Sequence, residues 1–298
     1  MKNILIIGRG SISKQHQDNI RSHFDLNIIE ISEKENLSSF LINNEFDGAI
    51  ICSSTSLHQE NIIHLHDNAV PFYCEKPAFL NLNFLNKLKE MDTAFLAKCS
   101  IGFNLRYHSV IKKIREVIEK NYNQLFFSLS VGSDVRKWRQ SREIDSIYSL
   151  SKNRGGGAIA ELSHEIDLAV YLFGPMKVFS SLSKADPWKS AVDGTSFIIL
   201  ENQNFSGQIM LDLTSSLFFR TIRIWGEDFH LNADLLTGKI SLNLSNIEKD
   251  FELEVNRNQT LKDSLFDFIK QNKNRKNNLL DCLESSIIIA ELHEKIRL

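Results

Sequence analysis

A short apolar run ends in an acid, a base and a proline at residues 70–77, which read Val-Pro-Phe-Tyr-Cys-Glu-Lys-Pro. We interpret Phe72–Cys74 as a buried strand bounded by prolines. Glu75 and Lys76 then lie at the carboxyl end of a strand, the edge where open α/β sheets bind ligands. A lysine there could meet a cofactor and a substrate together. A surface Glu-Lys pair at a strand exit is the plain alternative.

The amino terminus shows a second ligand-binding pattern, an apolar run followed at once by a Gly-x-Gly turn. Gly8 is expected to allow the turn, and Gly10 to let the backbone approach a pyrophosphate. Ser11 and Ile12 would then begin a helix whose N-terminus holds that pyrophosphate. Ser13 replaces the third glycine of the full pattern, at a position where a small residue is tolerated. The turn alone is weak evidence, and the strand before it and the helix after it strengthen it.

Polar residues at the ends of the next strands could contact the rest of a dinucleotide. Glu30 lies twenty residues after Gly10, where a carboxylate accepts hydrogen bonds from ribose hydroxyls and repels a 2′-phosphate. We therefore expect NAD as the cofactor, with NADP possible. Ser53, Ser54 and His58 follow the third strand and could touch the adenosine or ribose. The alternatives are an exposed glutamate at a strand end and a surface histidine at a helix start.

The pattern around these residues alternates strands and helices as far as residue 102. We count six strand-like runs, of which Ala94–Gly102 is the last. Alternation of this kind predicts a doubly wound parallel sheet, with residues 1–102 as a Rossmann-type dinucleotide-binding domain. Lys76 would leave one strand of that sheet at its carboxyl end.

A long segment without periodicity, residues 134–154, is rich in arginine and aromatic residues. Long loops within compact domains are usually functional or disordered. Arginine forks suit phosphate or carboxylate groups, and aromatic rings suit a sugar face or a base. We expect Trp138, Arg142 and Tyr148 to bind substrate, with further positive charge from Arg136, Arg139 and Arg154. A solvated basic face or an interface is the alternative.

Three glycines, Gly155–Gly157, precede an apolar helix that ends at Gly174. His164 is expected about two turns into that helix. Glu161 and Asp167, three residues before and after it, would lie on its face. A histidine oriented by a carboxylate is a plausible general base. The alternative is a partly buried structural histidine between domains.

The rest of the chain is predicted to form a second domain, residues 103–298. A charged helix is expected at about residues 109–120. Residues 177–255 contain strand-like runs of mostly antiparallel type, which are Val178–Ser183, Thr195–Glu201, Ser206–Leu213, Arg220–Trp225, Phe229–Asn232 and Phe251–Val255. Two helices finish the chain. The fold class is therefore α/β, with an N-terminal Rossmann sheet and a C-terminal α+β domain that contains a large, open, mostly antiparallel sheet.

Composition excludes several classes of function. The chain has 298 residues, a net charge of -2, 42% hydrophobic and 24% charged residues, which fits a globular protein and gives no sign of nucleic-acid binding. The four cysteines show no metal-ligand spacing, so we expect reduced thiols, no metal site and a cytoplasmic location. No run resembles a signal peptide or a membrane span.

Together these residues resemble the glucose–fructose oxidoreductase/inositol dehydrogenase/MocA family (Gfo/Idh/MocA). The resemblance runs through nearly the whole chain and rests on Gly8-Arg9-Gly10, Glu75-Lys76-Pro77, Asn104-Leu105-Arg106, and Gly155-Gly156-Gly157 with His164-Glu165-Ile166-Asp167. The segment around His164 is most similar to members linked to bacterial surface-sugar pathways. Many members have aspartate four residues before the histidine, where this chain has Ala160 and an acid follows at Glu161.

The resemblance implies an NAD(P)-dependent dehydrogenase or reductase that acts on a sugar, sugar acid or nucleotide sugar. It implies Lys76 and His164 as catalytic residues, Arg106 as a substrate contact, and a homo-oligomer, dimer or tetramer, formed through the C-terminal sheet. Two other readings remain open. One is an NAD-dependent glycosidase of the same family, and the other is a sensor that binds the dinucleotide without catalysis. The arginines favour an anionic sugar.

Overall fold

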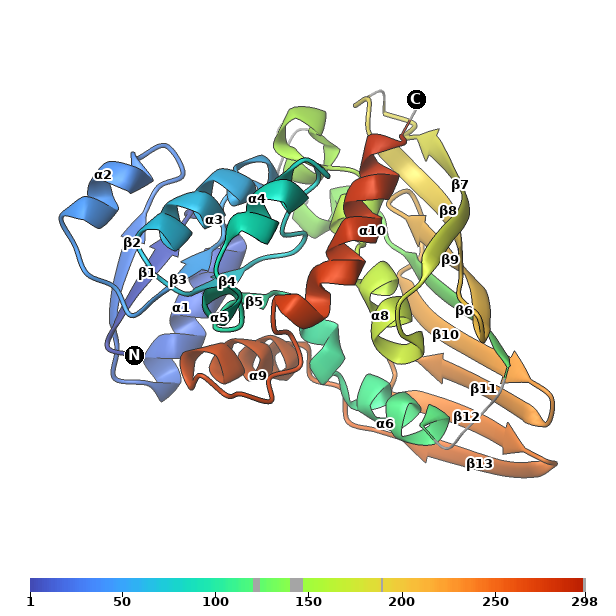
Figure 1. Cartoon of the computed structure of the whole chain (residues 1–298). Helices are drawn as coiled ribbons and strands as arrows, with labels where there is room; N and C mark the ends of the chain where they lie inside the picture. The colour runs from blue at the N-terminus through green and yellow to red at the C-terminus, as the bar shows by residue number, and fades with distance from the viewer. Residues whose placement is uncertain (120–123, 140–146, 189, 297–298) are drawn as a thin grey trace. The chain divides into compact units, whose positions relative to one another are not determined.

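A computed structural model describes residues 1–119, 124–139, 147–188 and 190–296 of the chain. Contacts within the chain divide it into two compact units, coloured along the sequence in Figure 1. The first unit comprises Met1–Asn104 with Asn258–Ala290, and the second comprises Leu105–Arg257 with Glu291–Leu298. The first unit thus takes in residues 258–290, which the sequence analysis had placed in the second domain.

The first unit contains a parallel sheet of five strands in the order β2-β1-β3-β4-β5. The strands are β1 (Asn3–Ile7), β2 (Asn27–Ile31), β3 (Gly48–Ile51), β4 (Phe72–Cys74) and β5 (Ser100–Ile101). Ile6 of β1 lies opposite Glu30 on one side and Ile50 on the other. The strand order reverses at β1 and β3, so their carboxyl ends flank the crevice where such sheets bind ligands.

Helices cover both faces of this sheet, which confirms the predicted doubly wound architecture (Figure 1). The chain moves in opposite directions from β1 to β2 and from β3 to β4, so right-handed crossovers place the two connecting helices on opposite faces. The helices of this unit are α1 (Ser11–His23), α2 (Leu37–Ile42), α3 (His58–Asp67), α4 (Phe84–Glu90), α5 (Thr93–Leu96), α9 (Arg257–Ile269) and the first part of α10 (Leu283–Glu294).

Helix α9 explains why a late segment belongs to the first unit. Its apolar residues Leu265, Phe268 and Ile269 are buried in one cluster with Ile4 and Ile6 of β1. Burial of apolar side chains of this size stabilises by roughly 2 kcal/mol each. Sequence periodicity shows that a helix is amphipathic but does not show which distant strand it covers.

The prediction of a strand over Ala94–Gly102 was wrong for its first half. Residues Thr93–Leu96 form α5, because the Asp92 side chain accepts hydrogen bonds from the backbone N–H groups of Ala94 and Phe95 at 3.2 and 3.0 Å. An N-cap of this kind favours a helical turn over an extended chain. The extended part of this run is limited to β5. The described sheet has five strands, whereas six strand-like runs were predicted.

The second unit is built on an eight-stranded sheet in the order β13-β12-β11-β10-β6-β9-β8-β7. Its strands are β6 (Leu125–Gly132), β7 (Lys177–Ala185), β8 (Asp193–Glu201), β9 (Phe205–Asp212), β10 (Phe219–Gly226), β11 (Phe229–Asp234), β12 (Lys239–Leu244) and β13 (Ile247–Glu252). Neighbours are antiparallel except β6 and β9, which are parallel. The predicted large, mostly antiparallel sheet is confirmed, although the sequence analysis missed β12.

Helices cover one face of this second sheet. They are α6 (Ser109–Ile118), α7 (Ala158–Glu161) and α8 (His164–Phe173), and α8 contacts β6 and β9 while α7 contacts β8 and β9. The opposite face carries exposed apolar side chains at alternate positions along the strands. In β8, Phe197 and Ile199 are exposed whereas Ile198 and Leu200 are buried. That alternation identifies the outer face of the sheet.

Candidate active site

The turn after β1 has the geometry that a phosphate-binding loop requires. Gly8 has a φ of +107°, and a Cβ there would lie 2.7 Å from the carbonyl oxygen of Cys52, so only glycine fits. Gly10 is the N-cap of α1, and a Cβ on it would meet nothing within 4 Å. Ser11 and Ile12 form the first turn of this thirteen-residue helix. An open glycine before a helix N-terminus suits the approach of an anionic group.

Glu30 at the end of β2 is held in a defined orientation. Its Oε1 accepts hydrogen bonds from Ser13 Oγ at 2.6 Å and Gln17 Nε2 at 2.7 Å. Its side chain is 29% exposed, and Oε2 lies 3.7 Å from Nε of Arg9. Ser13 therefore orients the carboxylate, whereas the sequence analysis treated this serine only as a tolerated replacement for glycine. The arrangement presents both an acid and a cation where a ribose would bind.

Ser53 and Ser54 fix the exit of β3 by their own hydrogen bonds. Ser54 donates from its backbone N–H and from Oγ to one Glu33 carboxylate oxygen, at 2.8 and 2.9 Å. Ser53 Oγ accepts a hydrogen bond from Asn61 Nδ2 at 2.9 Å. Both serines lie at the predicted edge of the sheet, and their contact with a cofactor stays a prediction.

His58, the first residue of α3, is a buried histidine and not a surface one. It is 1% exposed, with Nδ1 2.8 Å from the carbonyl oxygen of Pro77 and Nε2 3.1 Å from that of Ser53. Burial lowers the pKa of His58 below its ordinary value, although the two carbonyl oxygens and Glu75 act in the opposite direction. A direct contact with a dinucleotide would require one of these hydrogen bonds to open.

The Glu75-Lys76-Pro77 segment follows β4 at the carboxyl edge of the sheet, as predicted. The backbone N–H of Glu75 donates to the carbonyl of Ile51 at 3.0 Å, and the Lys76–Pro77 peptide bond is cis. Glu75 and Lys76 are half-buried. The Glu75 carboxylate lies 2.7 Å from Nε2 of His16, a fully buried residue of α1. The sequence analysis missed His16, although a histidine on the apolar side of this helix was a visible signal.

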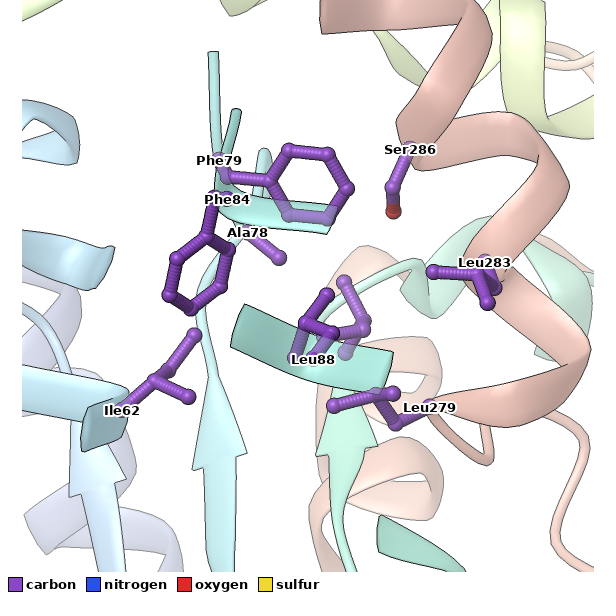
Figure 2. A pocket seen from close by; sticks show the side chains of 9 residues that line it. Ile62, Ala78, Phe79, Phe84, Leu88, Leu279, Leu283 and Ser286 are labelled. Carbon is purple, nitrogen blue, oxygen red and sulfur yellow. The ribbon is translucent and has the colours of Figure 1, made fainter. Parts of the chain in front are cut away.

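Apolar packing holds the chain just beyond this segment. Ala78 and Phe79 lie against Ile62 of α3, Phe84 of α4 and Leu283 of α10 (Figure 2). The space between these side chains is too narrow for a water-sized sphere. It is therefore a packing feature of the core and not a place for a sugar or a nucleotide.

The His164 segment is divided into two helices, where the sequence analysis expected one. Helix α7 ends at Glu161, Leu162 is its C-cap, and α8 begins at His164 with Ser163 as N-cap. His164 is therefore the first residue of its helix and not two turns inside it. The positive end of a helix disfavours a second positive charge, which suits a proton acceptor at this position. His164 and Glu161 are both half-buried.

Two ion pairs, one buried and one partly buried, anchor α8. Asp167 accepts hydrogen bonds from Nε of Arg106 at 2.9 and 3.2 Å, and the guanidinium also lies 4.8 Å from the centroid of the Tyr171 ring. Glu165 Oε1 lies 2.7 Å from Nε of Arg220 on β10. Breaking a buried pair of this type by removing one partner costs roughly 3–5 kcal/mol. These contacts fix the helix that begins with His164.

The Arg106–Asp167 pair changes the expected roles of both residues. Arg106 is 1% exposed, so a substrate contact would require its pair with Asp167 to open. The Asp167 carboxylate accepts its described hydrogen bonds from Arg106. These hydrogen bonds do not support the prediction that Asp167 orients His164. Of the two acids predicted near His164, Glu161 is the more exposed one.

A remote carboxylate explains the last of the three glycines before α7. Asp193 of β8 accepts hydrogen bonds from the backbone N–H of Ile159 at 2.9 Å and from Ser196 Oγ at 3.0 Å. Gly157 has a φ of +116°, and a Cβ on it would overlap the Asp193 carboxylate. Burial raises the pKa of Asp193 to about 6, against these hydrogen bonds, which lower it. The sequence analysis missed this capping residue, which lies 34 positions away from Ile159.

The predicted substrate loop is described in part. Trp138 is 42% exposed and donates from Nε1 to Ser133 Oγ at 2.7 Å. Tyr148 lies beneath the guanidinium of Arg154, 5.0 Å from its ring centroid. Arg142 and the side chain of Arg139 lie outside the described residues. The exposed indole and the stacked tyrosine remain candidates for contact with a substrate.

One arginine of this loop is already neutralised. Arg136 pairs with Asp134 at 2.8 Å and lies 4.7 Å above the Trp188 ring. The Arg136 side chain holds the pKa of the Asp134 carboxyl below its usual range. Arg136 is therefore poorly suited to bind an anion. Arg154 is the other arginine of this loop whose side chain the structure describes, and it stays a candidate.

The chain is similar to known sugar dehydrogenases. It is 22% identical over 189 residues to a glucose-6-phosphate 3-dehydrogenase from Bacillus subtilis, covering 58% of this chain and 54% of that protein. The curated relatives that it matches are covered over 40–54% of their length, so the chain spans about half of each. No family model matches the chain.

Solved structures share the fold of almost the whole chain. An inositol dehydrogenase homologue from Azotobacter vinelandii, complexed with NAD⁺, has a TM-score of 0.80 and 9% identity, covering 98% of this chain and 93% of that one. The WlbA dehydrogenase from Bordetella pertussis, in complex with NADH and UDP-GlcNAcA, has a TM-score of 0.78 and 15% identity, covering 98% and 95%. Within the described part of the chain, no helix has the length and apolar character needed to cross a membrane.

Proposed function

We propose that this protein is an NAD-dependent oxidoreductase of the Gfo/Idh/MocA type that transfers a hydride between nicotinamide and a hydroxyl-bearing carbon of a sugar derivative. The observation that carries the proposal is the carboxyl edge of the first sheet. There a glycine turn opens onto the N-terminus of α1, while Lys76 leaves β4. The likeness to sugar dehydrogenases supports the same activity.

The first unit has the groups that NAD requires. The open turn at Gly10 and the first turn of α1 would hold the pyrophosphate, and the Glu30 carboxylate would accept the ribose hydroxyls. Bound nicotinamide supplies a hydride acceptor or donor. The structural neighbours in complex with NAD⁺ or NADH support this choice. Arg9 beside Glu30 leaves NADP possible.

Lys76 and His164 would divide the proton chemistry. Oxidation of an alcohol removes a proton from oxygen as the hydride leaves carbon. We assign His164 as the base that takes this proton, and Lys76 as the cation that orients the hydroxyl and stabilises developing negative charge on its oxygen. Glu161 would orient the imidazole. The reverse assignment, with Lys76 as the base, is the alternative that mutagenesis must separate.

The substrate is proposed to be an anionic sugar, such as a sugar phosphate, a sugar acid or a nucleotide sugar. Arg154 above Tyr148 presents a cation beside an aromatic face, a combination that suits a charged sugar. One relative is named for glucose 6-phosphate and one solved structure contains UDP-GlcNAcA, which are both anionic, whereas another relative is named for the neutral myo-inositol.

The working form is proposed to be a cytoplasmic homo-oligomer. The outer face of the second sheet exposes large apolar side chains, among them Phe126, Phe197 and Trp225. Phe126 and Trp225 stack with their ring centroids 6.1 Å apart. Contiguous exposed patches of this type mark interaction sites, and a second copy of the same sheet would be a self-complementary partner. All four cysteines are buried free thiols, which fits a reducing compartment.

A panel of sugars tests the proposal. Purified protein is incubated with NAD and glucose 6-phosphate, UDP-N-acetylglucosaminuronic acid, glucuronate, glucose or myo-inositol, and NADH absorbance is followed. We expect reduction of NAD with at least one anionic sugar and faster turnover than with either neutral compound. Faster turnover of the neutral compounds would refute the anionic substrate. Cofactor binding without any NADH formation or sugar cleavage would favour a sensor. Sugar cleavage without net NADH formation would favour a glycosidase.

A further inference from the structure

Lys76 lies between two residues that buried histidines hold. We propose that His16 and His58 are positioning residues that fix the chain on either side of Lys76 and so place its ammonium group for the reaction. This inference rests on the proposed oxidoreductase function. It concerns residues of the first unit alone, and neither histidine is proposed to touch the substrate.

His16 holds the residue before Lys76. Its ring is fully buried in α1 and packs edge-on against Tyr73 of β4, with ring centroids 5.4 Å apart. Nδ1 has no hydrogen-bond partner among the described residues, whereas Nε2 lies 2.7 Å from Glu75 Oε1. A proton on Nδ1 would be a buried donor without an acceptor, so the neutral ring must carry its proton on Nε2 and donate it to Glu75.

Gly102 limits the same carboxylate from the other side. A Cβ on Gly102 would lie 3.1 Å from Glu75 Oε2 and 3.2 Å from the Glu75 Cα, so the absence of a side chain there makes room for the acid. Glu75 is thus placed between α1 and the end of β5. A partly buried hydrogen bond to a carboxylate fixes geometry more firmly than an exposed one would.

His58 holds the residue after Lys76. Both ring nitrogens face backbone carbonyl oxygens, which only accept, and a neutral imidazole can donate from one nitrogen at a time. Because burial lowers the pKa of His58, the neutral ring is the form expected at neutral pH. The contact to Pro77 is the shorter, 2.8 Å against 3.1 Å for Ser53, so the proton is assigned to Nδ1 and directed at Pro77.

Together the two histidines bind the segment to helices on both faces of the sheet. α1 holds Glu75 through His16, and α3 holds Pro77 through His58. The backbone of Lys76 is therefore held on both sides. A misplacement of about 1 Å can cost a catalytic group roughly 100-fold in rate. Loss of either histidine should therefore lower turnover through Lys76.

Substitutions at His58 separate its two contacts. Asparagine places an amide nitrogen near the position of Nδ1, and glutamine places one near Nε2, so His58→Asn can donate to Pro77 and His58→Gln to Ser53. His58→Phe keeps the ring and removes both contacts. We expect kcat to fall about 10- to 100-fold in His58→Phe and about 10-fold in His58→Gln, with most of the turnover recovered in His58→Asn.

Substitutions at His16 test its contact with Glu75 in the same way. Glutamine retains a donor near Nε2, so His16→Gln should recover most of the kcat that His16→Leu loses, while the KM for NAD should stay within about threefold of the parent value in both. For His58, the control is His64→Asn. His64 also lies in α3, and its side chain is 30% exposed and pairs with Glu60. A general effect of losing a histidine from α3 would appear in this control.

A second readout follows Lys76 directly, without catalysis. Protein is treated with a limiting amine-acylating reagent, and the rate of acylation at Lys76 is measured by peptide mass spectrometry relative to exposed Lys89. We expect the relative acylation rate of Lys76 to change by at least about threefold in His58→Phe and His16→Leu, and to return toward the parent rate in His58→Asn and His16→Gln. Thermal unfolding of each variant shows that the labelled protein is folded.

The outcomes distinguish this inference from the proposed function. Parental kcat and parental Lys76 labelling in folded His58→Phe and His16→Leu would overturn the positioning role. Equal losses in His58→Asn and His58→Gln would overturn the assignment of the proton to Pro77. A parent protein that oxidises no sugar would refute the proposed function, while the labelling rates would still decide whether the histidines place Lys76.

Discussion

At the scale of single residues, the chemistry depends on groups whose orientation other side chains set. Short motifs predicted Gly8, Gly10, Lys76 and His164, because these lie next to strand ends or glycine runs in the sequence itself. The side-chain pairs that hold the neighbouring segments could not be predicted in this way. His16 and Glu75 are 59 positions apart, and the pair formed by Arg106 and Asp167 spans 61. Distances of this kind are fixed by strand order and helix packing, which local patterns do not encode.

Cofactor preference is a prediction about Glu30. Its carboxylate, oriented by Ser13 and Gln17, should repel the 2′-phosphate of NADP, so the parent should bind NAD more tightly. Glu30→Ala should narrow the ratio of the two dissociation constants by roughly 10-fold, about 1.4 kcal/mol. Fluorescence titration of both cofactors measures this ratio. Arg9→Ala is the matched variant and should weaken NADP alone; tighter NADP binding by the parent would refute the role of Glu30.

At the scale of elements, capping decided several boundaries that hydrophobic patterns could not. Asp92 caps α5 within a run that looked like a strand, and Asp193 caps α7 from a distant strand. The break between α7 and α8 moved His164 from the interior of a predicted helix to the first position of a real one. The polar edge strand β13 gave little apolar signal, so its predicted position was late by several residues.

A pH dependence follows from the cap of α6. His108 Nδ1 accepts a hydrogen bond from the backbone N–H of Val110 at 3.2 Å, and burial lowers the pKa of His108 to about 4. At pH values between about 4 and 6.5, His108 binds a proton in the unfolded state but not in the folded state. The free energy of unfolding therefore falls as pH falls. The full effect is about 3 kcal/mol. Urea unfolding at pH 7 and pH 4.5 should show less acid destabilisation in His108→Asn; equal pH dependence would contradict this.

The cap of α7 should respond to pH with the opposite sign. The raised pKa of Asp193, about 6, means that the folded state binds a proton that the unfolded state releases above its ordinary value of 3.8. The stability that this bound proton contributes is therefore present at low pH and lost as pH rises through about 6. The free energy of unfolding falls by about 3 kcal/mol when the loss is complete. In Asp193→Asn this loss between pH 4.5 and pH 7.5 should vanish. An unchanged loss in the variant would show that Asp193 does not titrate as proposed.

At the scale of the whole molecule, the architecture of both sheets was predictable, and the assignment of every segment to a unit was not. Alternating strands and helices specify a parallel sheet, and closely spaced strands with turns specify an antiparallel one. The apolar face of α9 was visible as well. Its partner surface on β1 was not, because any apolar sheet face could have received it.

Association of two copies is the prediction at this scale. The exposed face formed by Phe126, Phe197 and Trp225 should be buried in the oligomer. Phe197→Asp would place a charge at the interface and should convert the oligomer to a smaller species in sedimentation velocity. The free energy of association should weaken by roughly 2–4 kcal/mol or more. Ile42→Asp, at an exposed apolar residue of α2, is the control and should leave the oligomer intact. A parent protein that sediments as a monomer would refute the proposal.

The central claim is that Lys76 and His164 perform the proton chemistry of hydride transfer. The most direct measurement is turnover with the best sugar, together with NAD affinity, in Lys76→Met and His164→Ala. We predict that each substitution lowers kcat by about 10²–10⁴-fold while the dissociation constant for NAD changes little, because the lost group acts on the hydroxyl and not on the cofactor. Near-parental turnover in both variants would contradict the claim, and near-parental turnover in His164→Ala alone would assign the base to Lys76.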